Sequence, residues 1–333
     1  MTRARKLAYG LLSTLLLLMI AELGLRALIP REKLLFSWEK PNGALFAQAS
    51  GRTTMNPNQT TTRMDGPHEW TMRINGQGFR EEAEIPYEKP PGQRRWLALG
   101  DSWMVGFNAD EGHSLPDLLE AGLPEILGQP VEVINNGQFG GSAFDMLVAW
   151  RAAQSLQPDA LLLGWPHNGW RQEDLHDVRQ QWYARTRPAP RSDARLYLLT
   201  RLALYRLTRP VQPELSGEQI NEALADLSVI AREAKGLNIP VYLVIWPTQY
   251  DRRMDAGEAE FLVQSLRPMG VRFAGHSLAQ RSCWGYEDLF HPSEAGYAAV
   301  AQRVLSLIRD GESSLIVAAN PSCNEVPADG PGK

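Results

Sequence analysis

Three residue types that together perform nucleophilic catalysis occur in two short segments of this sequence. Ser102 ends a Gly-Asp-Ser triplet, and Asp288 and His291 lie three residues apart, far downstream. A serine hydroxyl becomes a nucleophile when a histidine accepts its proton, and a carboxylate that fixes the tautomer of the histidine makes it a better base. The two segments therefore predict Ser102 as nucleophile, His291 as base and Asp288 as the residue that orients the base.

The residues before Ser102 carry more information than the triplet, which occurs by chance in roughly one chain in twenty of this length. Trp96 to Leu99 is a short apolar run followed by a glycine, which is typical of a buried strand. Ser102 then follows the carboxyl end of a strand, the edge at which open α/β sheets bind their ligands.

Two acidic residues near these groups have alternative roles. Asp101 is expected to hold the loop around Ser102 by bonds from its side chain to the backbone, rather than to act in catalysis. Asp288 can instead cap a helix that begins near Ser293, but its spacing to His291 favours the orienting role.

Four sequence blocks, in their order between about Arg94 and Leu307, resemble those of the SGNH or GDSL-type hydrolases. The blocks contain Ser102 in Gly-Asp-Ser, Gly137 in Val-Ile-Asn-Asn-Gly, Asn168 in Gly-Trp-Pro-His-Asn-Gly, and the pair Asp288 and His291. The resemblance implies a catalytic triad of the serine, the aspartate and the histidine. Gly169 stands where the family usually has aspartate, which affects the packing of that loop more than its chemistry.

The same resemblance implies an oxyanion hole, a set of fixed donors for the charge that develops on a carbonyl oxygen during acyl transfer. The donors are the backbone N–H of Ser102, the backbone N–H of Gly137 and the side-chain amide of Asn168. Each follows a different predicted strand, so a parallel sheet brings them to one edge. Glycine suits the second position because it has no side chain to block the approach of a substrate.

Strands and helices alternate after the first strand, which predicts parallel pairing with right-handed crossovers. We expect a three-layer, doubly wound α/β sheet of the flavodoxin-like kind found in SGNH hydrolases. The further strands are expected at Val131 to Asn135, Ala160 to Gly164, Val241 to Trp246 and Val271 to Ala274. The helices are expected at Leu115 to Leu127, Ala143 to Ser155, Gly217 to Lys235, Ala256 to Leu266 and Ser293 to Ile308.

The amino terminus predicts a membrane anchor. Basic residues among the first six precede an apolar segment from Leu7 to Ile29, which as a helix is about 34 Å long and crosses the hydrocarbon core. The basic end is expected in the cytoplasm and the remainder outside it. Glu22 and Arg26 are charged, but at a spacing of four they can pair near the outer end. A cleaved signal peptide and a buried soluble helix are the alternatives to an uncleaved anchor.

The chain divides into four predicted regions. Residues 1–30 form the anchor or signal segment, 31–91 an extracytoplasmic lead-in, 92–312 the hydrolase domain and 313–333 a tail. An insertion at 172–213 is too long for a plain connection, and its aromatic and arginine content suggests a helical cap over the active-site face.

One part of the lead-in is similar to a segment that often precedes the core in membrane-anchored bacterial members of the family. It reads Arg73-Ile-Asn-Gly-Gln-Gly-Phe-Arg80. Its Asn75 and Gly78 suit tight turns, and Phe79 suits a plug into the core. We prefer this structural interpretation over a substrate-binding role for Arg80.

Composition limits the partners. The chain has 333 residues, 44% of them hydrophobic, which is enough for one large core, and its formal net charge is -4. Lysine and arginine do not cluster beyond the first six residues, so nucleic acid is not expected. No phosphate-binding loop or metal-ligand spacing occurs, so we expect neither cofactor nor metal. Cys283 and Cys323 either form one disulfide or remain two thiols.

The leading hypothesis is a serine esterase, held in the inner membrane of the cell with its catalytic domain in the periplasm. Its substrate is expected to be an O-acyl ester of envelope carbohydrate. An O-acyltransferase would use the same triad but pass the acyl group to a sugar hydroxyl, with the insertion limiting access of water. A catalytically inactive binding or assembly protein is the third hypothesis, and the intact triad argues against it.

Overall fold

The computed structural model describes residues 2–35, 46–49, 52–65, 68–165, 192–207, 217–245, 256–275, 281–285 and 291–311. The chain forms two compact units. One comprises Met1–Pro41 with Gln180–Val211, and the other comprises Asn42–Arg179 with Gln212–Lys333. The expected anchor therefore belongs to a different unit from Ser102 and His291.

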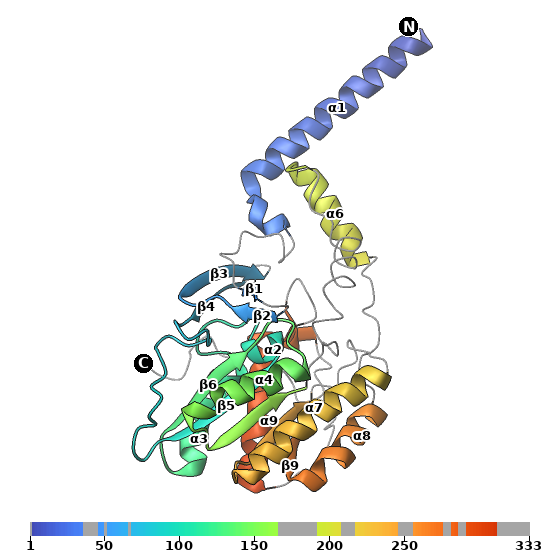
Figure 1. Cartoon of the computed structure of the whole chain (residues 1–333). Helices are drawn as coiled ribbons and strands as arrows, with labels where there is room; N and C mark the ends of the chain where they lie inside the picture. Colours follow the sequence, from blue (N-terminus) through green and yellow to red (C-terminus); the bar gives the residue numbers. More distant parts are fainter. Residues whose placement is uncertain are drawn as a thin grey trace. The chain divides into compact units, whose positions relative to one another are not determined.

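The larger unit contains the main sheet of the molecule (Figure 1). This sheet has five parallel strands in the order β6-β5-β7-β8-β9. Its strands are β5 (Arg94–Gly100), β6 (Val131–Gly137), β7 (Ala160–Gly164), β8 (Val241–Ile245) and β9 (Val271–Gly275). In chain order this is the 2-1-3-4-5 arrangement of a flavodoxin-like sheet, whose strand order reverses beside the first strand. The predicted doubly wound fold is confirmed.

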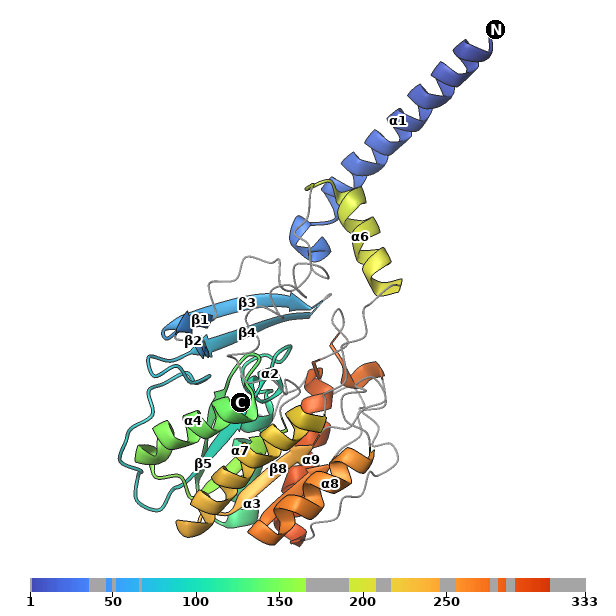
Figure 2. The same cartoon turned by 45° about the vertical axis from the view of Figure 1, so that its right-hand side comes forward.

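Helices cover both faces of this sheet (Figure 2). One face packs against α4 (Ala143–Ala153), α7 (Gly217–Gly236) and α8 (Ala256–Leu266), and the other packs against α3 (Leu115–Leu127) and α9 (Glu294–Asp310). Side chains of β5 alternate between the two resulting cores, with Leu97 and Leu99 in the first and Trp96 and Ala98 in the second. This alternation is the period of two that a strand imposes.

Local signals fix the starts of the helices near the site. Ser114 and Asp117 form a reciprocal capping box at the start of α3, and Ser142 and Asp145 form another at the start of α4. In each box the serine side chain accepts a backbone N–H that has no partner within the helix. Both helices therefore begin directly after the loops that follow β5 and β6.

Antiparallel strand pairs form between residues 46 and 74 of the lead-in. Strand β1 (Phe46–Ala49) pairs with β2 (Arg52–Met55), and β3 (Gln59–Asp65) pairs with β4 (His68–Ile74). The buried side chains of β4 pack with those of the segment that follows Ser102; this cluster contains Met55, Trp70, Met72, Ile74, Val105 and Phe107. The lead-in is thus part of the wall behind the nucleophile, which the sequence interpretation did not include.

The smaller unit consists of α1 (Arg3–Leu28), a 3-10 helix η1 (Arg31–Leu34) and α6 (Arg195–Leu207). Within α1, Arg5–Leu28 is long and apolar enough to cross a membrane. A signal sequence can have the same length and composition. The expected pair forms, with Arg26 Nε 2.6 Å from Glu22 Oε1. The described part of the insertion contains α6, which packs against α1 and η1, and the expected position of the insertion over the active-site face stays a prediction.

Candidate active site

Ser102 and His291 meet at the carboxyl end of β5. Ser102 is the first residue of the short helix α2 (Ser102–Val105), which begins two residues after the strand ends. His291 Nε2 lies 2.8 Å from Ser102 Oγ, within the hydrogen-bonding range of a nucleophile and its base. Ser102 is 5% exposed, so the bond forms in a site largely shielded from water. The structure thus brings together two of the three predicted triad residues.

Several contacts hold His291 in this position. Its carbonyl accepts the N–H of Gly285 at 2.9 Å, and Trp284 forms a β-bridge with Pro292. The ring of Phe107 contacts the imidazole in a tilted arrangement, with the ring centroids 4.4 Å apart and 39° between the planes. Cys283, beside this bridge, is disulfide-bonded. The segment is therefore fixed by backbone bonds, an aromatic contact and a covalent link.

Asp101 has the structural role that the sequence predicted. Its side chain accepts the N–H of Trp103 at 3.0 Å and caps the amino terminus of α2. Such a bond satisfies a donor that the first turn of a helix leaves unpaired. The carboxylate thereby fixes the turn on which Ser102 is displayed.

Glycines allow α2 to lie close to the sheet. A Cβ at Gly137 would be 2.5 Å from Val105 N, and one at Gly100 would be 2.6 Å from Met104 Cβ. Both distances are far shorter than ordinary contacts, so larger residues would push α2 away from the strands. Gly137 therefore has a packing role that places the nucleophile.

The backbone amide of Gly137 is engaged elsewhere. Its N–H donates to Asn135 Oδ1 at 3.2 Å, on the free edge of β6. A role in the predicted oxyanion hole requires that bond to break. Gly140 is a second candidate donor, because its N–H reaches no acceptor among the described residues. The loop that contains it lies beside the nucleophile, since Gln138 N donates to Gly100 O at 2.9 Å.

Arg80 is a buried residue of this site, and its backbone partners could not be predicted from the sequence. Its guanidinium donates to the carbonyl oxygens of Val105 and Gly106 through Nη1, at 2.8 and 2.7 Å, and to those of Ala109 and Asp110 through Nη2, at 2.8 and 3.0 Å. These carbonyls belong to the end of α2 and the loop that carries Phe107. The contacts support the structural interpretation of this arginine. Its guanidinium holds the segment from Val105 to Asp110, which we call the nucleophile loop.

The segment before Arg80 folds as expected. Asn75 Oδ1 accepts the N–H groups of Gln77 and Phe79, each at 3.0 Å, and Gly78 has a φ of 85°. A side chain that bonds its own backbone two residues on forms a tight turn. Phe79 packs on the main core as predicted.

A carboxyl group with an altered pKa lies behind the same loop. Glu81 Oε1 accepts the N–H of Asn135 at 2.8 Å. Burial, followed by repulsion from Asp117, Glu120 and Glu132, raises the pKa of Glu81 to about 8, against the lowering effect of that bond. The pKa of Glu120 is also raised by burial. These groups face the outer side of β6 and not the nucleophile.

Several predicted site residues lie outside the described residues. These are Asp288, Asn168 with its neighbour Gly169, and the aromatic pair Trp182 and Tyr183 of the insertion. Cys323, the other cysteine of the sequence, also lies there. Their assignments stay predictions. Among the described residues, no cluster of histidine, cysteine or acidic side chains could hold a metal ion.

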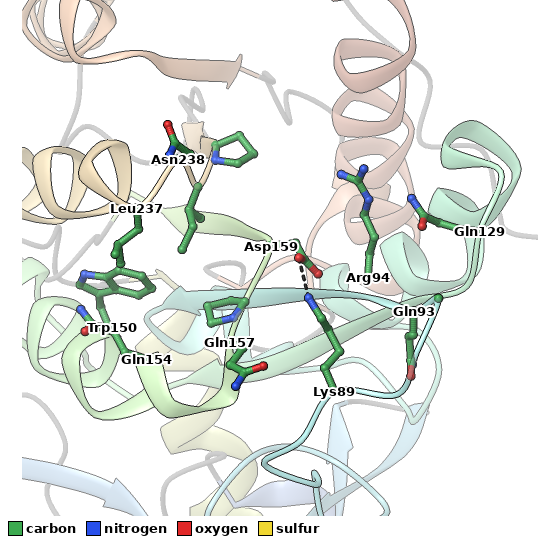
Figure 3. Close-up of a pocket in the computed structure, with 14 residues that line it drawn as sticks. Lys89, Gln93, Arg94, Gln129, Trp150, Gln154, Gln157, Asp159, Leu237 and Asn238 are labelled. Carbon is green, nitrogen blue, oxygen red and sulfur yellow. Dashed lines mark hydrogen bonds and ion pairs between the residues drawn. The ribbon is translucent and has the colours of Figure 1, made fainter.

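A cavity of about 760 Å³ lies at the opposite end of the sheet from Ser102. It is lined by residues at or just before the amino-terminal ends of the strands, including Arg94, Asp159 and Asn238 (Figure 3). Two of its lining residues form an ion pair, with Lys89 Nζ 2.5 Å from Asp159 Oδ1. Because it lies far from the nucleophile along the strands, we do not assign it to the reaction.

Comparison with known proteins finds similar folds among solved structures. AlinE4, an esterase of the SGNH-hydrolase family, is 22% identical over 56% of this chain and 77% of its own, with a TM-score of 0.34. TesA is 14% identical over 65% and 99% of the two chains, with a TM-score of 0.43. A putative acylhydrolase from Bacteroides fragilis is 13% identical over 68% and 92%, with a TM-score of 0.40. No family model and no curated protein matches the sequence.

Proposed function

We propose that this chain is a serine hydrolase of the SGNH type that cleaves ester bonds. The observation that carries the proposal is the 2.8 Å bond between Ser102 Oγ and His291 Nε2 at the carboxyl edge of a doubly wound sheet. Residues from opposite ends of the domain meet there in the geometry of a nucleophile and its base. An inactive binding protein would have no need of this pairing.

The reaction follows from the geometry. His291 Nε2 takes the proton of Ser102 Oγ as the oxygen attacks the ester carbonyl carbon, and the carbonyl oxygen becomes negatively charged. The intermediate collapses, and the leaving alkoxide takes the proton from His291. Water then repeats the sequence on the acyl-serine and releases the acid. Asp288 is assigned the other ring nitrogen, where it would hold the tautomer of the histidine.

The proposed oxyanion hole uses donors from the ends of neighbouring strands. Ser102 N–H makes no bond to an acceptor in the described part of the chain. Gly140 N–H, or Gly137 N–H after release from Asn135, supplies the second donor, and Asn168 supplies the third. Donors held by the fold stabilise the charged oxygen without rearrangement during the reaction.

The proposed location and substrate depend on α1. We assign α1 as an uncleaved transmembrane helix with its basic end in the cytoplasm. This orientation places the larger unit, which contains Ser102 and His291 and which we call the catalytic unit, outside the cytoplasmic membrane. There it would act on O-acyl esters of envelope carbohydrate. Protease added to spheroplasts should then degrade the catalytic unit, and recovery of the intact chain in the cytosol would refute this location.

A fluorophosphonate probe and an aryl acetate test the chemistry together. The wild-type protein should be labelled on Ser102 and should hydrolyse the ester. Ser102→Ala should abolish labelling, and both Ser102→Ala and His291→Ala should lower turnover by about 10³-fold or more. Circular dichroism checks that each variant is folded. Near-normal turnover by folded Ser102→Ala would refute the proposal, whereas acyl transfer to an added oligosaccharide in preference to water would identify a transferase.

A further inference from the structure

The carboxylate of Glu22 joins the apolar helix α1 to α6, a helix 173 residues away in the sequence. Glu22 Oε1 accepts the N–H of Arg195 and Glu22 Oε2 accepts the N–H of Leu196, each at 2.9 Å. Arg195 Nε donates to the carbonyl of Ile29 at 3.1 Å. Arg31, just beyond α1, pairs with Asp193 at 2.8 Å. The start of α6 is therefore bound to the last two turns of α1 and the residues that follow.

The position of Glu22 sets the depth of α6 in a membrane. At about 1.5 Å per residue, Arg5–Leu28 is roughly 36 Å long, while the hydrocarbon core is about 30 Å thick. Glu22 lies roughly 9 Å along the axis before Leu28. If α1 spans the bilayer, the first turn of α6 must lie near the boundary between the acyl chains and the headgroups. Both figures draw α6 running across the axis of α1 rather than alongside it (Figures 1 and 2).

The residues of α6 suit that boundary. Its sequence, Arg-Leu-Tyr-Leu-Leu-Thr-Arg-Leu-Ala-Leu-Tyr-Arg-Leu, has apolar residues on every side, three arginines and no acidic residue. Leu198 is fully buried against Leu34 and Leu35, but Leu199 and Leu204 are 39% and 55% exposed. Exposed leucines on a helix are favoured by an apolar environment on the side that its protein partners leave open.

We propose that α6 is a second membrane-contacting element, which lies in the outer interfacial layer of the bilayer beside α1. Leu199 and Leu204, its exposed leucines, contact the lipid acyl chains. The inference rests on the proposed anchoring by α1. It also gives a reason for the acidic residue in an otherwise apolar segment, because the charge of Glu22 is paired by Arg26 and by two backbone donors.

Spin labels on the full-length chain in vesicles of phosphatidylcholine and phosphatidylglycerol test the inference. Leu199→Cys and Leu204→Cys carry the label, and Leu237→Cys, also 55% exposed but in the catalytic unit, is the matched control. Oxygen concentrates among acyl chains and a nickel complex stays in water. The ratio of oxygen to nickel accessibility should therefore be several-fold higher at the two α6 positions than at the control.

Flotation of the vesicles separates the two proposals. If the chain does not float with the vesicles, the anchoring itself fails. If it floats but the α6 labels have the ratio of the control, α6 lies in water and the inference is overturned. Labels shielded from both reagents would mean that protein covers α6, which also overturns it. Glu22→Leu in the labelled chain should increase the mobility of the label at Leu199, and unchanged mobility would refute the docking through Glu22.

Discussion

Replacement of Arg80 by methionine tests how the nucleophile loop is held. The guanidinium serves four backbone carbonyls in the segment from Val105 to Asp110, and Arg80 is 5% exposed. A hydrogen bond from a charged donor contributes about 1.5–3 kcal/mol, but losses within one network do not add. We therefore expect Arg80→Met to cost about 3–5 kcal/mol, which at about 2–4 °C per kcal/mol lowers the melting temperature by roughly 6–20 °C.

The same change should impair turnover. The loop carries Phe107, whose ring contacts that of His291, and it continues from the helix that begins with Ser102. A displacement of these groups by about 1 Å can cost 10²-fold in rate, so the turnover number for an aryl acetate should fall by roughly 10- to 100-fold. The Michaelis constant should change little, since Arg80 is not expected to touch substrate.

Two further variants make the result interpretable. Arg94→Met removes an exposed arginine at the start of β5 and should change stability by no more than about 0.5 kcal/mol. Arg80→Lys keeps the charge, but a single ammonium group cannot reach both pairs of carbonyls, so it should fall between wild type and Arg80→Met. Melting curves and kinetics at temperatures where each variant is folded provide the measurement. Equal melting temperatures and turnover for Arg80→Met and Arg94→Met would refute the conclusion that Arg80 holds the nucleophile loop.

Three other changes have defined outcomes. Because the pKa of Glu81 is raised from 4.5 to about 8, its stabilising contribution is complete below about pH 4.5 and is lost as the pH rises toward about 8. Between pH 5 and 8.5 the free energy of unfolding of the wild type should fall by an amount on the order of a few kcal/mol as Glu81 loses its proton. Glu81→Gln, which mimics the protonated acid, should remove this fall, as measured by urea titrations at each pH. If the free energy of unfolding of the variant depended on pH as that of the wild type does, this prediction would be contradicted. Gly137→Ala should cost about 2 kcal/mol or more and lower turnover, because its Cβ would contact Val105 N; a variant that melts like wild type would show that α2 can move freely. Asn168→Ala should lower the turnover number by about 10²-fold with a smaller effect on the Michaelis constant, and a change in the Michaelis constant alone would reassign the residue to substrate binding.

Much of the fold could be predicted because local signals and periodicity agree along the chain. Helix α3 begins and ends at the predicted residues, since Ser114 caps its start and Gly128, with a φ of 67°, ends it. Strand β7 also has its predicted bounds. Strand β6 continues two residues past its predicted end, because its pairing with β5 extends to Gly100 opposite Gly137. That extension depends on the neighbouring strand, which no local pattern encodes.

The parts of the site that were missed differ in whether a signal existed. Trp70, Met72 and Ile74 alternate with polar residues in β4, and this period of two could have predicted a strand in the lead-in. The burial of Arg80 had no such signal, because arginine is usually exposed and its four acceptors are backbone groups. The engagement of Gly137 N–H by Asn135 depends on which edge of β6 faces outward. Only the strand order determines that.

Strand β6 is an edge of the main sheet, and its outward-facing backbone is occupied by other groups. Val133 N–H donates to Glu120 at 2.7 Å, Asn135 N–H donates to Glu81 at 2.8 Å, and Asn135 O accepts the N–H of Arg80 at 3.0 Å. An open edge is a template onto which another chain can add a strand, and an edge whose backbone groups are already hydrogen-bonded is a poorer template. Proteins confined to a membrane meet one another often, since they diffuse in two dimensions. If the chain is anchored, the occupied backbone groups of β6 would keep neighbouring copies from pairing their sheets and aggregating.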